Sequence, residues 1–323
     1  MIATKKIINH IPYAIETINL PPKFGRKHQG KVRDSYILKN KRIFITTDRQ
    51  SAFDKVLGLI PLKGQVLTQL SAFWFKKTAD IVPNHLITVV DPNVMVVKNS
   101  KLIPIEMVVR GYITGVTDTS IWGSYEKGER VIYGIKFPNG LKKNQKLPKP
   151  VITPTTKAEK GHDERLTEED ILKRKIVTPI IWKQMKKVAL GLFARGQKIA
   201  DKAGMILVDT KYEMGLLNGK LILIDEIHTP DSSRYWVKKT YKKRLVTGLE
   251  PESYDKEPLR IWFKERGYKG EGIPPKMPPE FIAKMSTLYM GIYEKITGKK
   301  FVPDLSINSS KRIAENLGKA KFV

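Results

Sequence analysis

The segment from Leu207 to Trp236 places charged side chains inside apolar runs. Two runs typical of β-strands flank the turn signal Asn218-Gly219, which predicts a hairpin. Burial of a carboxylate in a strand is unfavourable unless a cation or a metal ion neutralises it. We therefore expect chemistry at this hairpin, at its strand-interior charges Asp209, Lys211, Glu213, Asp225 and Glu226.

Two registers are open to this hairpin. A two-residue type I′ turn pairs Leu217 with Lys220, whereas a type I turn followed by Gly219 in a bulge pairs Leu216 with Lys220. Because side chains alternate along a strand, the first register separates the carboxylates of the two strands and the second brings them to one face. We predict the second register, since only that one builds a site.

In the second register Lys211, Glu213 and Asp225 share a face, with Lys211 opposite Asp225. Glu213 and Asp225 would then suit a magnesium ion that is held by one or two carboxylates and by nucleotide phosphates. The alternative is an internal salt bridge between Lys211 and Asp225. If the two carboxylates lie on opposite faces of the hairpin, the metal-site hypothesis is wrong.

A second candidate for phosphate binding is the stretch from Gly25 to Val32, GRKHQGKV. It is one residue short of a Walker A motif, and Val32 has no hydroxyl for magnesium. The residues that follow read as a strand rather than a helix. A strand–loop–strand lid fits better, with Gly30 allowing close backbone approach and Lys31 and Arg33 meeting phosphate oxygens. The alternative is a basic surface hairpin.

Three further stretches suit anion binding or proton transfer. The turn from Pro230 to Arg234, PDSSR, either offers backbone N–H groups and a guanidinium to a phosphate or carboxylate, or is an ordinary loop. Arg110 ends an apolar strand and is either an anion anchor or a snorkelling surface residue. His162 and Asp163 form either an acid/base pair or a polar loop cluster.

The composition excludes several kinds of site. The 323 residues suffice for two domains or one large one, and the 41% hydrophobic content is that of a folded globular protein. The absence of cysteine excludes disulfides, thiolate metal sites and cysteine nucleophiles. A zinc enzyme is not expected, because no pair has metal-ligand spacing among His10, His28, His85, His162 and His228.

The formal net charge of +27 admits three interpretations: a nucleic-acid binder, an enzyme for polyanionic small substrates, or basic decoration of the surface. The lysines are spread over the whole length, which favours the last. No apolar run approaches the ~18 residues that span a bilayer, and the N-terminus lacks the apolar core of a secretory signal. We expect a cytoplasmic protein without a nucleic-acid or membrane partner.

Periodicity predicts the elements that position these residues. Strands are expected at Lys31–Leu38, Arg42–Thr47 and Ile103–Arg110. Helices are expected at Gly64–Asp80, from Thr178 to about Ala203, and at Pro258–Arg266, Pro279–Thr297 and Leu305–Leu317. Residues 111–165 show little periodicity and read as a long loop. Thr167 begins a capping-box pattern, and Thr178-Pro179 has the residue types of a helix start.

Taken together, six stretches resemble one family, that of phosphoribosylaminoimidazole-succinocarboxamide synthase (SAICAR synthetase). They occur in the family's order between about Gly30 and Trp236: GKVRD, TTDRQSAFD, IPIEMVVRGYITG, TPTTKAE, LVDTKYEMG and DEIHTPDSSRYW. The family usually has Gly-Ser soon after the arginine of the third motif, whereas here a short insertion separates Gly115 from Ser120. Met214 stands where the family tends to have Phe, an exchange that leaves the chemistry unchanged.

The resemblance implies an ATP-dependent ligase of purine biosynthesis. Its substrates would be ATP, carboxyaminoimidazole ribonucleotide and L-aspartate, and its cofactor Mg²⁺. ATP would convert the substrate carboxylate to an acyl phosphate, which the aspartate amine then displaces. The implied fold is α+β with an antiparallel nucleotide-binding lobe, related to those of kinases and ATP-grasp enzymes, and a second α/β lobe with C-terminal helices. We place these lobes at residues 1–112 and 113–323 and leave monomer and homodimer open.

The resemblance also implies roles for individual residues. Lys211, Asp225 and Arg234 would carry the reaction, and Glu213 and Asp225 would bind magnesium. The nucleotide would be bound by Lys31, Val32, Arg33, Lys98, Leu102, Glu106 and Lys211. The other substrates would be bound or surrounded by Arg110, Ser120, Asp231, Ser233, Arg234, Lys157, His162, Asp163, Asp48, Arg49, Ser51, Asp54 and Lys63.

Two other functions fit parts of the pattern. A small-molecule kinase would use the same lid and magnesium pair, and would turn over ATP with the ribonucleotide alone. A basic nucleic-acid protein would bind DNA or RNA with a steep dependence on salt and would not need Glu213.

Overall fold

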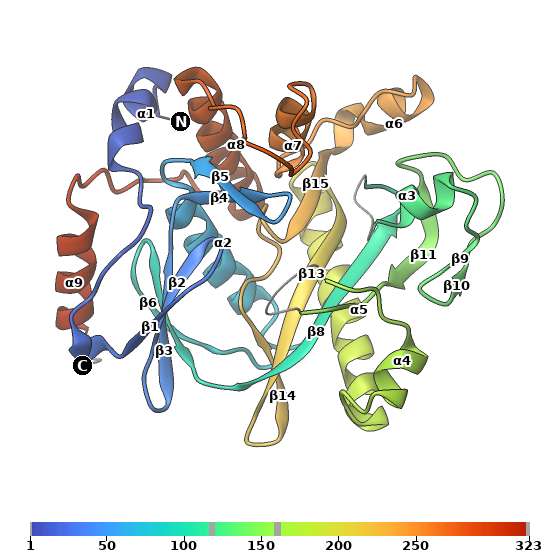
Figure 1. Cartoon of the computed structure of the whole chain (residues 1–323), viewed down its shortest axis with the longest axis horizontal. Helices are drawn as coiled ribbons and strands as arrows, with labels where there is room; N and C mark the ends of the chain where they lie inside the picture. The colour runs from blue at the N-terminus through green and yellow to red at the C-terminus, as the bar shows by residue number, and fades with distance from the viewer. Residues whose placement is uncertain (1, 116–119, 158–162, 321–323) are drawn as a thin grey trace.

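Antiparallel sheets surrounded by helices make up the computed structural model, which describes residues 2–115, 120–157 and 163–320 (Figure 1). This confirms the predicted α+β class with C-terminal helices. The first sheet has five strands, here in spatial order: β1 (Arg26–Gln29), β2 (Arg33–Ile37), β3 (Lys41–Thr46), β7 (Val94–Lys98) and β6 (Leu86–Asp91).

The second sheet has six strands and runs through the middle of the molecule (Figure 1). Its main path is β11 (Lys146–Ile152), β8 (Lys101–Tyr112), β13 (Met205–Leu217) and β14 (Lys220–Ile224). At its margins β12 (Thr155–Thr156) pairs with β8, and β15 (Ser233–Val237) pairs with β13. Two small ribbons are formed by β4 (Arg49–Ala52) with β5 (Lys55–Leu59) and by β9 (Val131–Ile132) with β10 (Ile135–Lys136).

Helices cover the sheets and form the C-terminal part of the chain. They are α1 (Thr4–His10), α2 (Lys63–Lys77), α3 (Ile121–Glu126), α4 (Glu168–Lys173), α5 (Pro179–Lys202), α6 (Lys238–Val246), α7 (Glu257–Lys264), α8 (Pro279–Thr297) and α9 (Ser309–Lys319), with 3-10 turns η1 (Ile11–Tyr13) and η2 (Pro22–Phe24). Helix α9 lies against the five-stranded sheet, into which it buries Ile313 and Leu317. Helices α1 and α2 both contact α8.

Local sequence explains the start of the longest helix. The Thr178 hydroxyl accepts a hydrogen bond from the Ile181 N–H, and Pro179 occupies the first turn, where no N–H is needed. Met185 and Leu192 recur at helical spacing and are buried against the six-stranded sheet. The predicted helix start and the predicted capping box of Thr167 are both confirmed.

The predicted register of the central hairpin is wrong. Leu217 pairs with Lys220, and both turn residues have positive φ, 51° at Asn218 and 75° at Gly219. This is the geometry of a two-residue type I′ turn, whose twist matches that of the flanking strands. Because Asn tolerates the left-handed conformation at modest cost, no extra bulge residue is required.

Residues 111–165 are not the unstructured loop that their weak periodicity suggested. Their described part contains α3 and the strands from β9 to β12. The division at residue 112 stays a prediction: β8, which ends there, is hydrogen-bonded along its length to β13 on the other side of the division. No helix within the described residues is both long and apolar enough to cross a membrane.

Candidate active site

Alternate residues of β13 face one side of the six-stranded sheet and carry its charge. Asp209 lies opposite Arg110 and Glu213 opposite Glu106, with Lys211 between them. The alternation places the aromatic ring of Tyr212 on the other side, in the core beneath α5. One strand therefore separates a charged face from the hydrophobic core.

A cavity of about 180 Å³ opens beside this charged face. Its walls come from β8, β13, the predicted PDSSR turn and the start of α7. Arg110, Arg234 and Lys211 line it, as do Asp231 and Ser233. Five of the predicted substrate or catalytic residues are thereby brought together.

Arginines and carboxylates alternate along the cavity wall. Asp209 pairs with both Arg234 and Arg110, the latter at 3.6 Å between Oδ2 and Nη1. Glu257 extends the chain of charges, with Oε2 at 3.7 Å from Arg234 Nη2 and 3.1 Å from Arg260 Nη1. Burial lowers the pKa of Arg234, but Asp209 and Glu257 outweigh it and raise the net value. Arg234 is thus held charged and oriented, ready to meet an anion. Burial lowers the pKa of Arg110, which Asp209 only partly offsets.

A second cluster surrounds Lys211. Its Nζ lies 2.6 Å from Glu106 Oε1 and 2.8 Å from Glu213 Oε1. The other carboxylate oxygen of Glu213, Oε2, forms an ion pair with the ammonium of Lys157. Burial lowers the pKa of Lys211, but the attraction of Glu213 and Glu106 raises it well above its usual value. Lys211 is therefore a cation at neutral pH.

Asp225 joins this cluster by a route other than the predicted one. The ladder ends with Ile224 opposite Glu213, and Asp225 then turns away from the strand with a φ of 66°. Its carboxylate pairs with Arg33 of β2, whose Nη2 lies 3.4 Å from Glu226. Burial raises the pKa of Asp225, but Arg33 and then Lys157 lower it overall. The bend at Asp225 thus brings its carboxylate toward the cluster around Lys211, which the strand register alone would not do.

The donor set fits a magnesium ion that shares its ligands with phosphates. Glu213 is a buried carboxylate and Asp225 a half-buried one. Cations neutralise both, and oxygen donors are those that magnesium prefers. Within the described residues no group of three or more His, Asp or Glu side chains could hold a metal ion. A protein-only cage is therefore absent from that part of the chain, and the ion would need further oxygens from water or from a ligand.

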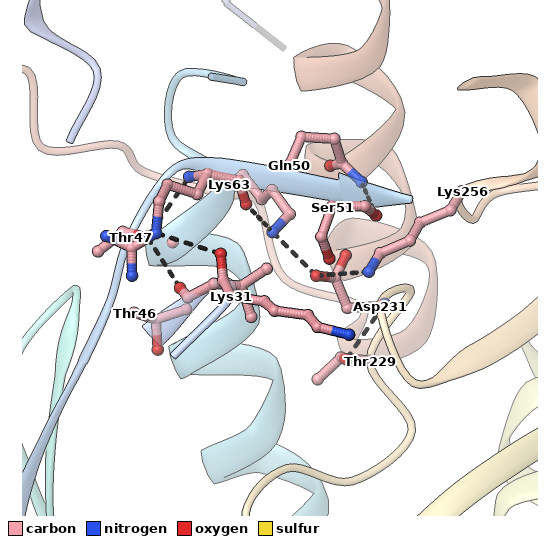
Figure 2. A network of polar contacts seen from close by, with 12 residues as sticks. Lys31, Thr46, Thr47, Gln50, Ser51, Lys63, Thr229, Asp231 and Lys256 are labelled. Atoms are coloured by element: carbon pink, nitrogen blue, oxygen red, sulfur yellow. Dashed lines mark hydrogen bonds and ion pairs between the residues drawn. The ribbon is translucent and has the colours of Figure 1, made fainter. Parts of the chain in front are cut away.

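Asp231 anchors the substrate loop from inside the protein. Its Oδ2 lies 2.9 Å from Lys63 Nζ and 3.1 Å from Lys256 Nζ, and Tyr289 donates a hydrogen bond of 2.6 Å to Oδ1. Figure 2 shows the two lysines approaching Asp231 from different elements, α2 and the segment before α7. Asp231 borders the cavity, but its carboxylate is engaged by protein groups.

Asp48 and Arg49 hold backbone rather than face the cavity. Asp48 accepts hydrogen bonds of 2.8 Å from the N–H groups of Ile15 and Gly64, and burial raises its pKa to about 6. Arg49 donates to the carbonyls of Lys31 and Gly30, at 3.1 and 3.0 Å, and pairs with Asp34 at 2.7 Å. Arg49 therefore fixes the predicted phosphate-covering loop.

The tip of that loop is open to solvent. Lys31 Nζ lies 2.7 Å from Asp54, and more than half of each side chain is exposed. The carbonyl of Val32 accepts hydrogen bonds from both the backbone and the hydroxyl of Thr47. Nearby, Ser51 is half-buried on β4.

Other predicted positions are scattered. Lys98 and Leu102 are exposed, at the end of β7 and the start of β8. Ser120 is buried and caps α3 by accepting a hydrogen bond from Gly123, and it does not line the cavity. Burial raises the pKa of Glu106, and the charge of the half-buried Asp163 adds to this rise. His162 lies outside the described residues.

Sequence reasoning missed the segment that enters α7. Asp255, Lys256, Glu257 and Arg260 all line the cavity. Burial raises the pKa of Asp255 to about 7, and its oxygens accept hydrogen bonds from the N–H groups of Tyr235 and Glu257 at 2.9 and 2.6 Å. The sequence feature that could have indicated this segment is the cluster of charged residues immediately before the predicted helix Pro258–Arg266.

Comparisons with known proteins agree on one family. The model of the SAICAR synthetase family matches residues 26–276. The phosphoribosylaminoimidazole-succinocarboxamide synthase of Legionella pneumophila strain Paris is 51% identical over 297 residues, which are 91% of this chain and 94% of that protein.

Solved structures agree with the sequence comparisons. The SAICAR synthase of Saccharomyces cerevisiae complexed with SAICAR has a TM-score of 0.78 at 32% identity, covering 90% of this chain and 100% of that one. A SAICAR synthetase in complex with ADP has a TM-score of 0.66 at 26% identity, covering 86% of this chain and 100% of that one.

Proposed function

The chain belongs to the SAICAR synthetase family, and from this premise we propose that it joins carboxyaminoimidazole ribonucleotide to L-aspartate with conversion of ATP to ADP and phosphate. The observation that carries the assignment of residues is the continuity of the two charged clusters. Lys211 belongs to the carboxylate cluster and also lines the arginine-bordered cavity. A phosphoryl group held at the cluster would therefore lie next to an anion held in the cavity.

The cavity suits the ribonucleotide, which is an anion. Arg110 and Arg234 offer guanidinium groups that Asp209 holds in place, and such groups bind phosphate or carboxylate through two parallel hydrogen bonds. Ser233 lies beside them, with its hydroxyl 2.7 Å from that of Thr210. We assign Arg110, Ser233 and Arg234 to substrate binding and give Asp231 and Arg49 the task of positioning their loops.

In the first step the substrate carboxylate oxygen attacks the γ-phosphorus of ATP, and the bond from that phosphorus to ADP breaks. Lys211 lies where its ammonium can neutralise the transferred phosphoryl group, since Glu106 and Glu213 keep it charged. In the second step the aspartate amine attacks the acyl carbon, phosphate leaves, and the amine gives up a proton. Both steps require the reacting groups to be aligned, which binding in one cavity provides.

We assign Glu213 and Asp225 as the residues that would hold Mg²⁺, together with oxygens of the nucleotide. Bound there, the ion would neutralise charge that develops on the phosphates. Lys31, Val32 and Arg33 belong to the loop that would cover the nucleotide, and we assign Lys98 on β7 and Leu102 and Glu106 on β8 to the same ligand. The cytoplasmic location expected from the sequence stays a prediction.

An assay of ADP release tests the proposal. The protein is supplied with ATP, magnesium and the ribonucleotide, with and without L-aspartate. We expect turnover that requires aspartate and yields the succinocarboxamide product. Full-rate ADP release without aspartate would identify a small-molecule kinase instead, and a protein that binds DNA without any turnover would support the nucleic-acid alternative.

The variant Asp225→Asn tests the metal assignment in the same assay. We expect activity to fall by about 100-fold or more, because the carboxylate charge at the transferring phosphates is lost, while the circular dichroism spectrum stays that of the wild type. The control is Asp80→Asn, which removes a carboxylate from a surface pair with Arg195. Near-normal activity of Asp225→Asn would remove the metal role.

A further inference from the structure

The cations that neutralise Glu213 and Asp225 are not held equally firmly. Lys211 lies between two carboxylates, at 2.6 and 2.8 Å, and its side chain is 29% exposed. The side chain of Arg33 is 10% exposed, contacts both Asp225 and Glu226, and lies 5.5 Å from the centre of the Phe44 ring. Displacing either cation would leave several partners unpaired, which is costly inside a protein.

Lys157 is attached, in the part of the chain that the structure describes, by a single ion pair. Within the described residues, Glu213 is the carboxylate that its ammonium contacts. Its side chain is 34% exposed, against 5% for that of Glu213. It stands directly after the short strand β12, where its backbone N–H donates to Pro104 at 3.3 Å. The ammonium can therefore leave into water without moving a packed element.

A charge count supports exchange at this position. The cluster contains four carboxylates, Glu106, Glu213, Asp225 and Glu226, and three cations, Lys157, Lys211 and Arg33. Counted over the described residues, this cluster thus carries a formal excess of one negative charge. Without Lys157 the excess is two, which one divalent cation neutralises.

We propose that Lys157 is an exchangeable cation, which occupies Glu213 in the metal-free enzyme and yields it to the divalent metal ion when the nucleotide arrives. The displaced ammonium then pairs with phosphate oxygens of the nucleotide. This inference rests on the proposed metal site and adds a property to it. Because Lys157 gains a new anionic partner only when phosphates are present, metal and nucleotide bind cooperatively.

Manganese binding to the nucleotide-free protein tests the exchange without any assay of activity. Lys157→Met removes the competing ammonium, so the Kd for Mn²⁺, measured by electron paramagnetic resonance, should fall by about tenfold. The matched control is Lys186→Met, since Lys186 also pairs with a glutamate and its side chain is likewise 34% exposed. An unchanged or raised Kd in Lys157→Met, including undetectable binding in both proteins, would overturn the proposal.

Amine labelling of the wild type gives an independent readout. Mass spectrometry after mild acetylation reports the reactivity of Lys157 relative to that of Lys186 in the same sample. Saturating Mg²⁺ with ADP should raise the relative labelling of Lys157 in a short pulse if the phosphates hold it less tightly than Glu213 does, and lower it if they hold it more tightly. Labelling of Lys157 that is identical with and without these ligands contradicts the exchange.

The two proposals fail in distinguishable ways. If the wild type ligates aspartate but Lys157→Met binds Mn²⁺ as the wild type does, the exchange is wrong and the ligase assignment stands. If the wild type shows no aspartate-dependent turnover but Lys157→Met binds Mn²⁺ more tightly, the exchange holds for a different reaction of a metal nucleotide.

Discussion

At the scale of single residues, the site depends on carboxylates whose partners come from distant parts of the chain. Asp231 is the clearest case. Lys63 and Lys256 converge on it (Figure 2), as does Tyr289, and all three are buried. Burial raises the pKa of Asp231, but Lys256 and then Lys63 outweigh it, so the carboxylate is ionised. A buried charge of this kind stabilises the fold only while its partners remain.

The variant Asp231→Asn should therefore be strongly destabilised. Loss of the carboxylate charge leaves two buried ammonium groups without their anion, which costs about 3–5 kcal/mol of unfolding free energy. Urea denaturation measures this loss. In the control Asp54→Asn the lost partner of Lys31 is exposed, and the expected change is below about 1 kcal/mol. Equal losses in the two variants would show that the buried lysines do not depend on Asp231.

At the scale of elements, β13 organises both clusters. It pairs with β8, β14 and β15, and its alternation separates the charged face from the core. Its hairpin with β14 closes through a turn in which Asn218 and Gly219 both have positive φ. At the other end of the ladder, after Ile224, Asp225 takes a φ of 66° and its carboxylate pairs with Arg33.

Substitutions at Asn218 test this turn. A φ of 51° is unfavourable for Ala and costs Gly nothing, so Asn218→Ala should be less stable than Asn218→Gly by about 1 kcal/mol or more. In the bulged register Asn218 would have negative φ, and Ala would be the better residue. The difference between the two thermal midpoints decides the matter, and an Ala variant as stable as the Gly variant would contradict the type I′ turn.

At the scale of the whole molecule, the sheets share a core that does not stop at residue 112. Side chains of α2 and β7 pack in one cluster with those of α5 and β13, among them Trp74, Val97, Leu192 and Tyr212. The anionic substrates account for only a few of the charges in a net +27.

Buried carboxylates connect the stability of the whole chain to pH. Asp255 should make the protein less stable as the pH rises. Burial raises its pKa in the folded state from 3.8 to about 7, so the folded state binds a proton that the unfolded state has lost. Its stabilising contribution is complete below pH 3.8 and is lost as the pH rises through about 7. We expect the unfolding free energy to fall between pH 5 and pH 8 by roughly 1 kcal/mol or more, and to fall less in Asp255→Asn.

The control for this prediction is Asp80→Asn. The pKa of the Asp80 carboxyl is lowered by a hydrogen bond from Arg195, so this group does not titrate between pH 5 and pH 8. Denaturation curves at the two pH values should therefore differ by the same amount in this variant and in the wild type. If Asp255→Asn also shows the wild-type difference, Asp255 is not the titrating group.

The sequence by itself determined the residue types of the site and the features that depend on near neighbours. The caps of α4 and α5 follow from Thr167 and Thr178, because such bonds join residues three apart. The six motifs were sufficient to identify the family, since their order and residue types survive without any coordinates.

Only the tertiary structure decided which carboxylate faces which cation. Arg33 and Asp225 are 192 residues apart, and Asp231 and Tyr289 are 58 apart, so no local pattern could pair them. The hairpin register was also decided by structure, because both turns were compatible with Asn-Gly. Ion pairs of this kind form where packing brings elements together, and burial then determines the free energy of each pair.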